Sequence, residues 1–428
     1  MTERTADGRL TGRRRWAALA GLAAVAVLLG VSTPTAPTAP TAPTALQSVG
    51  GGKGGRSVFG GAGAQCTPPS PEVARAVPWA QKRLSPERVW PLTRGQGVTV
   101  AVIDTGVDGS AAALKGRVLA GVDVVNGGGT ADDDCFGHGT FVAGIIGAKW
   151  LTGTGVSGVA PDVKILPIRQ ANNSSDGTAA GMATAIVAAV DGGADVINIS
   201  ASSFLPSKAL EDAVRYATAS DVLIVTAASN EAEAGNPKAY PAAYPDVMSV
   251  GAIGPDGQRS EFSETGDFLD VVAPGVNITG LSRGGVTHVQ DSGTSYAAPF
   301  AAGVAALVRA YRPELSAGQV KRRLELTADH PGRTLPDPAL GWGVVNPWAA
   351  VTMDIPEESG AVADSAGPTK VVTPTKATPD TWARDNAMTV GALAGLAAAI
   401  AISVGLVWPR GRQRGWQPAA ASARGQTL

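Results

Sequence analysis

Short apolar runs alternate with alanine-rich or amphipathic stretches through most of this chain. Residues 98–103 form a continuous β-branched and apolar run, which is typical of a strand buried on both faces of a sheet. The same pattern predicts strands at 163–168, 195–199, 222–227, 247–252 and 268–272, and helices at 177–191, 207–218 and 317–327. Repeated strand–helix units predict an α/β fold with a mainly parallel sheet covered by helices.

The stretch 297–311 is apolar on almost every face, so it predicts a buried central helix. Pro299 would fall in its first turn, where the missing N–H costs little. Ser295 would then lie at the helix N-terminus, where free N–H groups and the helix dipole favour negative charge. A serine whose attack creates an oxyanion suits this place, although most serines at such positions merely cap helices.

Two further motifs favour a catalytic role for Ser295 over a capping role. Asp104 ends the strand 98–103 within Asp-Thr-Gly, and His138 opens a small-residue helix within His-Gly-Thr. The chain order Asp104, His138, Ser295 is that of subtilisin. Over roughly residues 89–351 the sequence resembles the subtilisin-like serine proteases. The resemblance implies a three-layer α/β fold with the catalytic site at strand ends, and an Asp-His-Ser triad that hydrolyses peptide bonds.

The resemblance also implies an oxyanion hole. Asn230 follows the strand 222–227 at the place of the family's oxyanion asparagine, and would act with the backbone N–H of Ser295. Without the triad, an asparagine after a strand would equally well be a turn residue.

The substrate-binding edge is expected at Ser200, Ala201 and Ser202, which follow the strand 195–199 and would pair with the substrate backbone. Many relatives carry glycine where Ser202 and Ser229 stand, so we expect a narrower pocket for small residues. The alternative is that both are ordinary loop serines.

The chain has two cysteines, Cys66 and Cys135. In an exported protein we expect them to form a disulfide that pins the amino-terminal extension beside His138. Two unpaired thiols are the alternative. A metal site is disfavoured, because two cysteines do not complete a tetrahedral shell.

The composition adds little beyond domain size. The 428 residues, 44% hydrophobic with net charge −1, allow one large domain plus accessory segments, and no charge bias indicates nucleic acid. His288 and His330 have no catalytic context and are read as surface or loop histidines. Asp108 and the run 132–134 match no EF-hand spacing, so we expect a solvated acidic turn and neither metal nor cofactor.

The two ends of the chain indicate export and anchoring. Residues 1–45 contain an export signal followed by Thr-Ala-Pro repeats, although the apolar run 16–31 could be an uncleaved anchor. Residues 46–90 are an extension expected to wrap the catalytic domain, 91–352. A Pro-rich linker, 353–386, precedes an uncharged apolar run, 387–409, which is long enough to span a bilayer as one transmembrane helix.

The orientation of the predicted transmembrane helix in the membrane follows from the charged residues that flank it. Arg410, Arg412 and Arg414 lie in the tail 410–428, so the positive-inside rule places this tail in the cytoplasm and the protease outside. Gly391 and Gly395 form a small-xxx-small face that could pack on another membrane helix.

The whole layout resembles the mycosins, the membrane-anchored subtilases associated with type VII secretion in actinobacteria. The resemblance implies a polypeptide substrate and a secretion membrane complex as partner. Two alternatives remain, a structural subunit of that complex with accessory proteolysis and a generic anchored subtilase. The intact triad favours retained catalysis, whereas the tethering linker and the paired glycines favour a partner.

Overall fold

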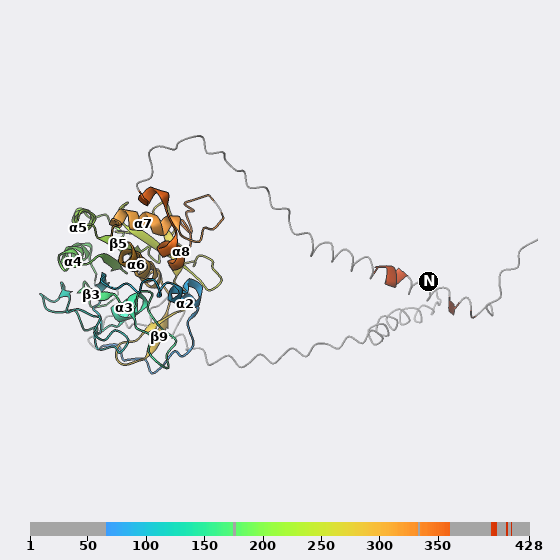
Figure 1. Ribbon diagram of the computed structural model, residues 1–428, viewed down its shortest axis with the longest axis horizontal. Coiled ribbons are helices and arrows are strands. Elements are labelled where there is room, and N and C mark those ends of the chain that lie inside the picture. Colours follow the sequence, from blue (N-terminus) through green and yellow to red (C-terminus); the bar gives the residue numbers. More distant parts are fainter. Residues whose placement is uncertain are drawn as a thin grey trace, which may run out of the picture. The chain divides into compact units, whose positions relative to one another are not determined.

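The computed structural model describes residues 66–173, 177–332, 334–359, 395–399, 408–409 and 412 (Figure 1). The chain divides into two units, Met1–Ala361 and Val362–Leu428. The predicted signal segment, and most of the predicted linker, span and tail, lie outside the described residues. Among the helices that are described, none has both the length and the apolar character needed to cross a membrane.

A seven-stranded sheet forms the centre of the first unit. Its strand order is β2-β3-β1-β4-β5-β6-β7, and every neighbouring pair is parallel. The strands are β1 (Thr99–Asp104), β2 (Val122–Asp123), β3 (Lys164–Arg169), β4 (Val196–Ile199), β5 (Leu223–Ala227), β6 (Met248–Ile253) and β7 (Val271–Pro274). The predicted mainly parallel sheet is therefore confirmed, with most strand limits within one or two residues.

Helices cover both faces of this sheet (Figure 1). They are α2 (Trp79–Leu84), α3 (His138–Gly147), α4 (Ala179–Asp191), α5 (Lys208–Ala219), α6 (Thr294–Tyr311), α7 (Ala317–Leu326) and α8 (Pro347–Thr352). Within the described part of the first unit there are also three short 3₁₀ turns, η1 (Pro86–Arg88), η2 (Ala232–Ala234) and η3 (Pro356–Ser359).

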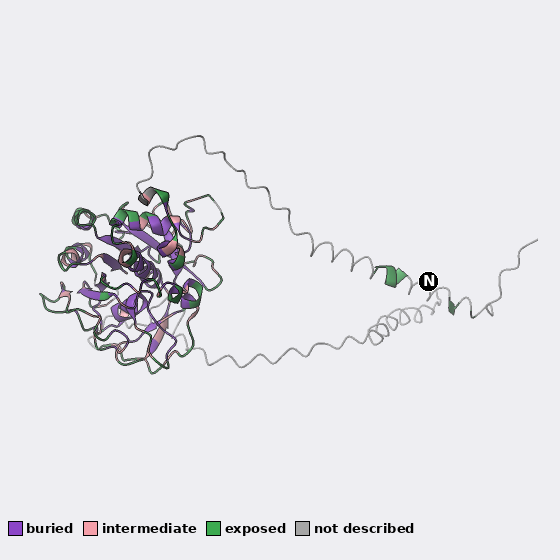
Figure 2. Ribbon diagram, in the orientation of Figure 1, coloured by how far each residue is buried: buried purple, intermediate pink, exposed green. Residues whose placement is uncertain are grey.

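Alternation along the strands produces two hydrophobic cores. In β1, Val100 and Val102 point into the core shared with α3 and α6, whereas Ala101 and Ile103 point into the core shared with α4 and α5. This is why parallel strands read as unbroken apolar runs. Helix α6 is buried along almost its whole length, as predicted, and Figure 2 shows it beside the buried sheet.

The hairpin of β8 (Ile278–Leu281) and β9 (His288–Asp291) was not predicted. Gly280 interrupts the apolar pattern of β8, which hid the strand in the sequence. Glycine is needed at this position, because a Cβ atom there would lie 2.5 Å from the ring of Phe141 in α3. His288 was wrongly read as a surface or loop residue. It is buried in β9, and its Nδ1 accepts a hydrogen bond from the backbone N–H of Ala74 at 3.2 Å. His330, in contrast, is an exposed loop residue.

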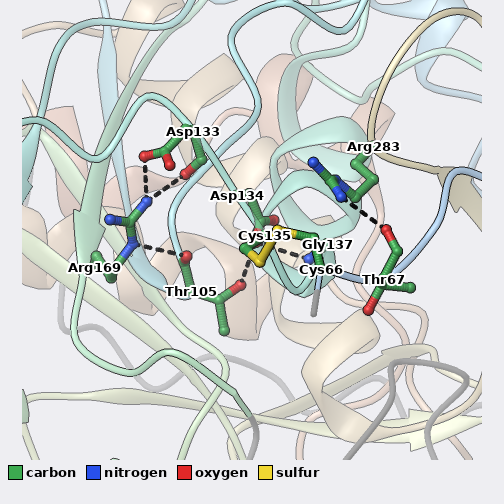
Figure 3. Close-up of a disulfide and its surroundings, with 9 residues drawn as sticks. All are labelled: Cys66, Thr67, Thr105, Asp133, Asp134, Cys135, Gly137, Arg169 and Arg283. Atoms are coloured by element: carbon green, nitrogen blue, oxygen red, sulfur yellow. Dashed lines mark hydrogen bonds and ion pairs between the residues drawn. A yellow bond between two sulfur atoms is a disulfide. The ribbon is translucent and has the colours of Figure 1, made fainter. Parts of the chain in front are cut away.

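The described part of the amino-terminal extension, from Cys66 onward, is bonded to the body of the domain. Cys66 and Cys135 form a disulfide, and the N–H of Thr67 donates to the carbonyl of Cys135 at 2.9 Å. The Arg283 side chain donates to the carbonyl of Thr67 (Figure 3). Further along, the N–H of His288 donates to a carbonyl of the extension at 2.7 Å. From Cys66 to Pro78 the extension is irregular, and it then forms the short helix α2, which was not predicted.

Breaking this disulfide should destabilise the domain substantially. Cys66 and Cys135 are 69 residues apart. Closing a loop of that length should contribute about 4 kcal/mol to the free energy of unfolding in the loop-entropy model. Cys66→Ser should therefore lower the thermal midpoint by about 10 °C, measured by calorimetry of the oxidised protein.

The double variant Cys66→Ser/Cys135→Ser is the matched control. Like the single variant it lacks the disulfide, but it leaves no free thiol at Cys135. Both variants should unfold at the same temperature, and reduction should shift the wild type toward them. Unchanged unfolding of Cys66→Ser would contradict a stabilising role for the bond.

Candidate active site

Three sequence motifs meet at one end of the sheet. Asp104 is the last residue of β1, His138 is the first residue of α3, and Ser295 is the second residue of α6. All three line one cleft of about 600 Å³, together with Asn230. Ligand sites of open α/β sheets lie at the carboxyl ends of the strands, which is where this cleft lies.

Asp104 and His138 form a close pair. The Nδ1 atom of His138 lies 2.8 Å from Oδ1 and 2.9 Å from Oδ2 of Asp104. The backbone N–H of Thr105 also donates to Oδ1 of Asp104 at 2.8 Å, which fixes the carboxylate. A carboxylate at Nδ1 holds the proton on that nitrogen, so that Nε2 is the basic atom of the neutral ring.

The surroundings make His138 more basic than a free histidine. Burial alone would lower the pKa of His138, but the charge of Asp104 and its hydrogen bond outweigh burial and raise it. The charges of Asp291 and Asp134 add to this rise in the pKa. An imidazolium formed during proton transfer is therefore stabilised.

The approach of α3 to β1 depends on Gly139. A Cβ atom there would lie 2.0 Å from the carbonyl oxygen of Gly106. A larger residue would push the start of α3 away from the loop after Asp104. The glycine of the His-Gly-Thr motif thus brings His138 within reach of its carboxylate.

Pro299 does not lie in the first turn of the helix, where it was predicted. Helix α6 begins at Thr294, so Pro299 lies in the second turn, where a missing N–H leaves the carbonyl of Ser295 without its helical partner. The Ser200 hydroxyl donates to that carbonyl at 2.9 Å. In return, the Ser295 hydroxyl donates to the carbonyl of Ser200 at 3.2 Å. Pro299 thereby couples the serine of α6 to the segment after β4.

Asn230 is oriented by the neighbouring helix start. Its Oδ1 accepts hydrogen bonds from the backbone N–H of Thr294 at 2.8 Å and from the Thr294 hydroxyl at 2.9 Å. Because a backbone N–H can only donate, the amide oxygen must face Thr294 and the NH₂ group must face elsewhere. A Cβ atom at Gly293 would lie 3.3 Å from Nδ2 of Asn230, so this glycine leaves room for the donor.

The predicted substrate edge lines the same cleft. Ser200, Ala201 and Ser202 face it together with Ser229. Ser229 has φ +92°, a left-handed conformation that favours glycine. This backbone explains why glycine suits the position and indicates that the serine side chain is retained at some conformational cost.

Asp134 is a site residue that the sequence reading missed, since the run 132–134 was read as a solvated turn. Asp134 is buried, and its Oδ1 accepts from the N–H of Gly137 at 2.8 Å and from the Thr105 hydroxyl at 2.9 Å (Figure 3). Its Oδ2 accepts from the N–H of Thr140 at 2.9 Å and from the Thr140 hydroxyl at 2.7 Å. Burial raises the pKa of Asp134 to about 6. Asp134 thus ties the start of α3 to the residue after Asp104.

Tyr296 was also missed. Its ring packs against His138 with the centroids 5.3 Å apart, and its hydroxyl donates to Asp291 at 2.7 Å. Its position next to Ser295 was the only signal in the sequence, and the apolar run around it made Tyr296 look like an ordinary core residue.

Comparison with known proteins agrees with this geometry. The model that describes the subtilase family matches residues 95–343, which is more than half of the chain. The chain belongs to the subtilase family. It is 39% identical over 361 residues to Mycosin-4 of Mycobacterium tuberculosis, a match that covers 73% of this chain and 78% of that relative. Subtilisin DY of Bacillus licheniformis is 40% identical over 259 residues, with 60% and 92% of the two chains covered.

A solved structure of a related protease is also similar to this chain. The MycP3 protease from the type VII (ESX-3) secretion system matches with a TM-score of 0.61 and 35% identity, covering 68% of this chain and 93% of that one. As in this family generally, the chain is a serine endopeptidase, and mycosins are among its relatives.

Proposed function

We propose that this subtilase hydrolyses polypeptides with Ser295 as nucleophile, His138 as general base and Asp104 as the residue that orients His138. The observation that carries the proposal is the contact of both Asp104 oxygens with Nδ1 of His138, in the cleft that Ser295 shares. This contact leaves Nε2 to receive the serine proton.

The reaction proceeds in two halves. The Ser295 hydroxyl attacks the scissile carbonyl carbon, its proton passes to Nε2 of His138, and His138 then protonates the leaving amine. Water hydrolyses the acyl-enzyme by the same route. The Ser295 hydroxyl donates to the Ser200 carbonyl at 3.2 Å, and during attack it would donate to Nε2 of His138. Catalytic hydrogen bonds are often long or misaligned before substrate binds.

The oxyanion would be held by two donors. One is the side-chain amide of Asn230, which Thr294 orients, and the other is the backbone N–H of Ser295 at the start of α6. The edge of Ser200, Ala201 and Ser202 would bind the substrate backbone as an added strand. Ser202 and Ser229 would narrow the first specificity pocket toward small residues.

The proposed setting is the outer face of a cell membrane, with type VII secretion as the process served. The likeness to Mycosin-4, and to a protease from the type VII (ESX-3) secretion system, supports this role. The anchor would be the apolar run 387–409, with the arginine-containing tail 410–428 in the cytoplasm. Substrates would be secreted polypeptides processed next to a secretion complex.

Accessibility from outside the cell tests this topology. Protease added to intact cells should remove an epitope in the catalytic unit, while an epitope placed after Leu428 should survive until the membrane is permeabilised. An inner-membrane-face marker protein serves as the control for cell integrity. Loss of the carboxyl-terminal epitope from intact cells would overturn the proposed orientation.

A further inference from the structure

Two large apolar side chains are exposed at the point where the predicted substrate edge ends. Phe204 is 44% exposed and Leu205 is 75% exposed, shortly after the edge 200–202. Within the part of the chain that the structure describes, Phe204 is also the one large exposed apolar residue that lines the active-site cleft. A single exposed apolar side chain is ordinary, but an adjacent pair at the rim of a binding cleft indicates a contact surface.

The segment that carries this pair is fixed on both sides. The N–H of Ser203 donates to the carbonyl of Tyr240, and the N–H of Tyr240 donates to the carbonyl of Ser203, both at 2.8 Å. The Ser203 hydroxyl donates to the carbonyl of Leu205 at 3.1 Å. Beyond the pair, the Tyr244 hydroxyl donates to the carbonyl of Ser207 at 3.2 Å, and the Ser207 side chain caps α5. A segment held in this way needs little further ordering when a ligand binds to it.

The bridge between Ser203 and Tyr240 also shows which side of the substrate edge is free. Successive residues of an extended chain direct their backbone groups to opposite sides, so those of Ser202 point away from Tyr240. Among the described residues, no backbone–backbone hydrogen bond uses the N–H or the carbonyl of Ser202 or Phe204. These groups are therefore available to an added substrate strand.

The nucleophile sets the register of that strand. Ser200 and Ser295 exchange hydrogen bonds, so the substrate residue whose carbonyl is attacked lies opposite Ser200. Because the proposed specificity pocket lies at Ser202, the acyl part of the substrate follows the edge, and it runs antiparallel to it. Residue-for-residue pairing then places about the third residue before the scissile bond opposite Ser202, and about the fifth opposite Phe204.

We propose that Phe204 and Leu205 form a subsite for a large apolar side chain of the polypeptide substrate, about five residues before the scissile bond. The occupant follows from continuity, because Phe204 lines the same cleft as Ser295 and is exposed at its rim. An aliphatic side chain placed against this pair removes apolar surface from water on both partners. The inference rests on the proposed substrate edge and extends specificity beyond the first pocket.

The test uses two acetylated fluorogenic peptides, Leu-Ala-Ala-Ala-Ala and Ser-Ala-Ala-Ala-Ala, each joined through its last alanine to aminomethylcoumarin. They differ only in the residue farthest from the bond that is cleaved, so the catalytic residues act on identical groups. In the wild type, kcat/KM for the leucine peptide should exceed that for the serine peptide by about tenfold, the order expected for one partly buried apolar side chain. The ratio is the readout, because a structural defect lowers both values by the same factor.

In the double variant Phe204→Ser/Leu205→Ser this ratio should fall to near one, while kcat/KM for the serine peptide should stay close to that of the wild type. Leu92→Ser is the matched control, since Leu92 is 42% exposed and does not line the cleft. This control should keep the preference of about tenfold.

Equal kcat/KM for the two peptides in an active wild type would overturn the subsite and leave the proposed triad intact. A preference for leucine that persists in the double variant would also overturn it, since another surface would then bind the side chain. If the wild type cleaves neither peptide and Ser295 does not react with a fluorophosphonate, the proposed function itself fails.

Two further measurements keep the subsite testable. If Ser295 reacts but peptide turnover is too slow, the concentration of each corresponding peptide aldehyde that halves the labelling rate replaces kcat/KM, with the same expected ratio. If the double variant does not fold, Leu205→Ser alone should lower the preference to about threefold, because half of the apolar contact is lost. An unchanged preference in Leu205→Ser would contradict the subsite.

Discussion

Ser295→Ala is expected to lower turnover of a peptide substrate by about 10⁶-fold while leaving the fold intact. The hydroxyl is half-buried, and its replacement costs the fold one hydrogen bond, to the carbonyl of Ser200. Such a bond is worth about 1 kcal/mol, so the thermal midpoint should change little. Residual hydrolysis should come from the oxyanion donors alone. Steady-state kinetics and calorimetry on the same preparation measure both effects.

Ser220→Ala is a matched control, since Ser220 is exposed at the end of α5 and should be dispensable for turnover. In cells, Ser295→Ala distinguishes a protease from a scaffold. A stably expressed variant that fails to restore secretion supports the proteolytic role. Full restoration of secretion would show that the chain acts mainly as a structural subunit.

Asp104→Asn should lower turnover by about 10⁴-fold without a change of shape. An asparagine can present its NH₂ group to Nδ1 of His138, which favours the tautomer with the proton on Nε2 and blocks proton acceptance there. Loss of the Asp104 charge should also lower the pKa of His138, because that charge raises it in the wild type. The acid limb of the activity profile should therefore move to lower pH.

The pH profile of the remaining activity checks this assignment. Asp267→Asn removes an exposed carboxylate and should leave both the rate and the acid limb unchanged. An Asp104→Asn enzyme with near wild-type turnover, or with its acid limb at higher pH, would contradict the role given to Asp104.

The architecture was largely predictable because parallel strands are buried on both faces. Residues such as Val100 and Ile103 belong to opposite cores, which leaves an unbroken apolar run that a single sequence reveals. Three motifs predicted the candidate site, since Asp104 ends a strand just before a Thr-Gly turn, whereas His138 and Ser295 each follow a glycine-containing turn. Their convergence on one cleft then follows from the parallel topology.

The residues that were missed depend on contacts distant in sequence. Asp134 looks solvated in an acidic run, yet hydroxyl and N–H donors of Thr105 and Thr140 surround it in the fold. His288 in β9 makes two hydrogen bonds with the amino-terminal extension, which is more than 200 residues away in sequence.

Peptide mapping of the fluorophosphonate adduct tests the central claim most directly. The oxidised wild-type protein is labelled at neutral pH, digested, and the modified residue identified by mass spectrometry. We expect one adduct, on Ser295, which does not form on heat-denatured protein and is absent from Ser295→Ala. An adduct on another serine of the cleft, such as Ser200 or Ser229, or equal labelling of Ser295→Ala, would contradict it.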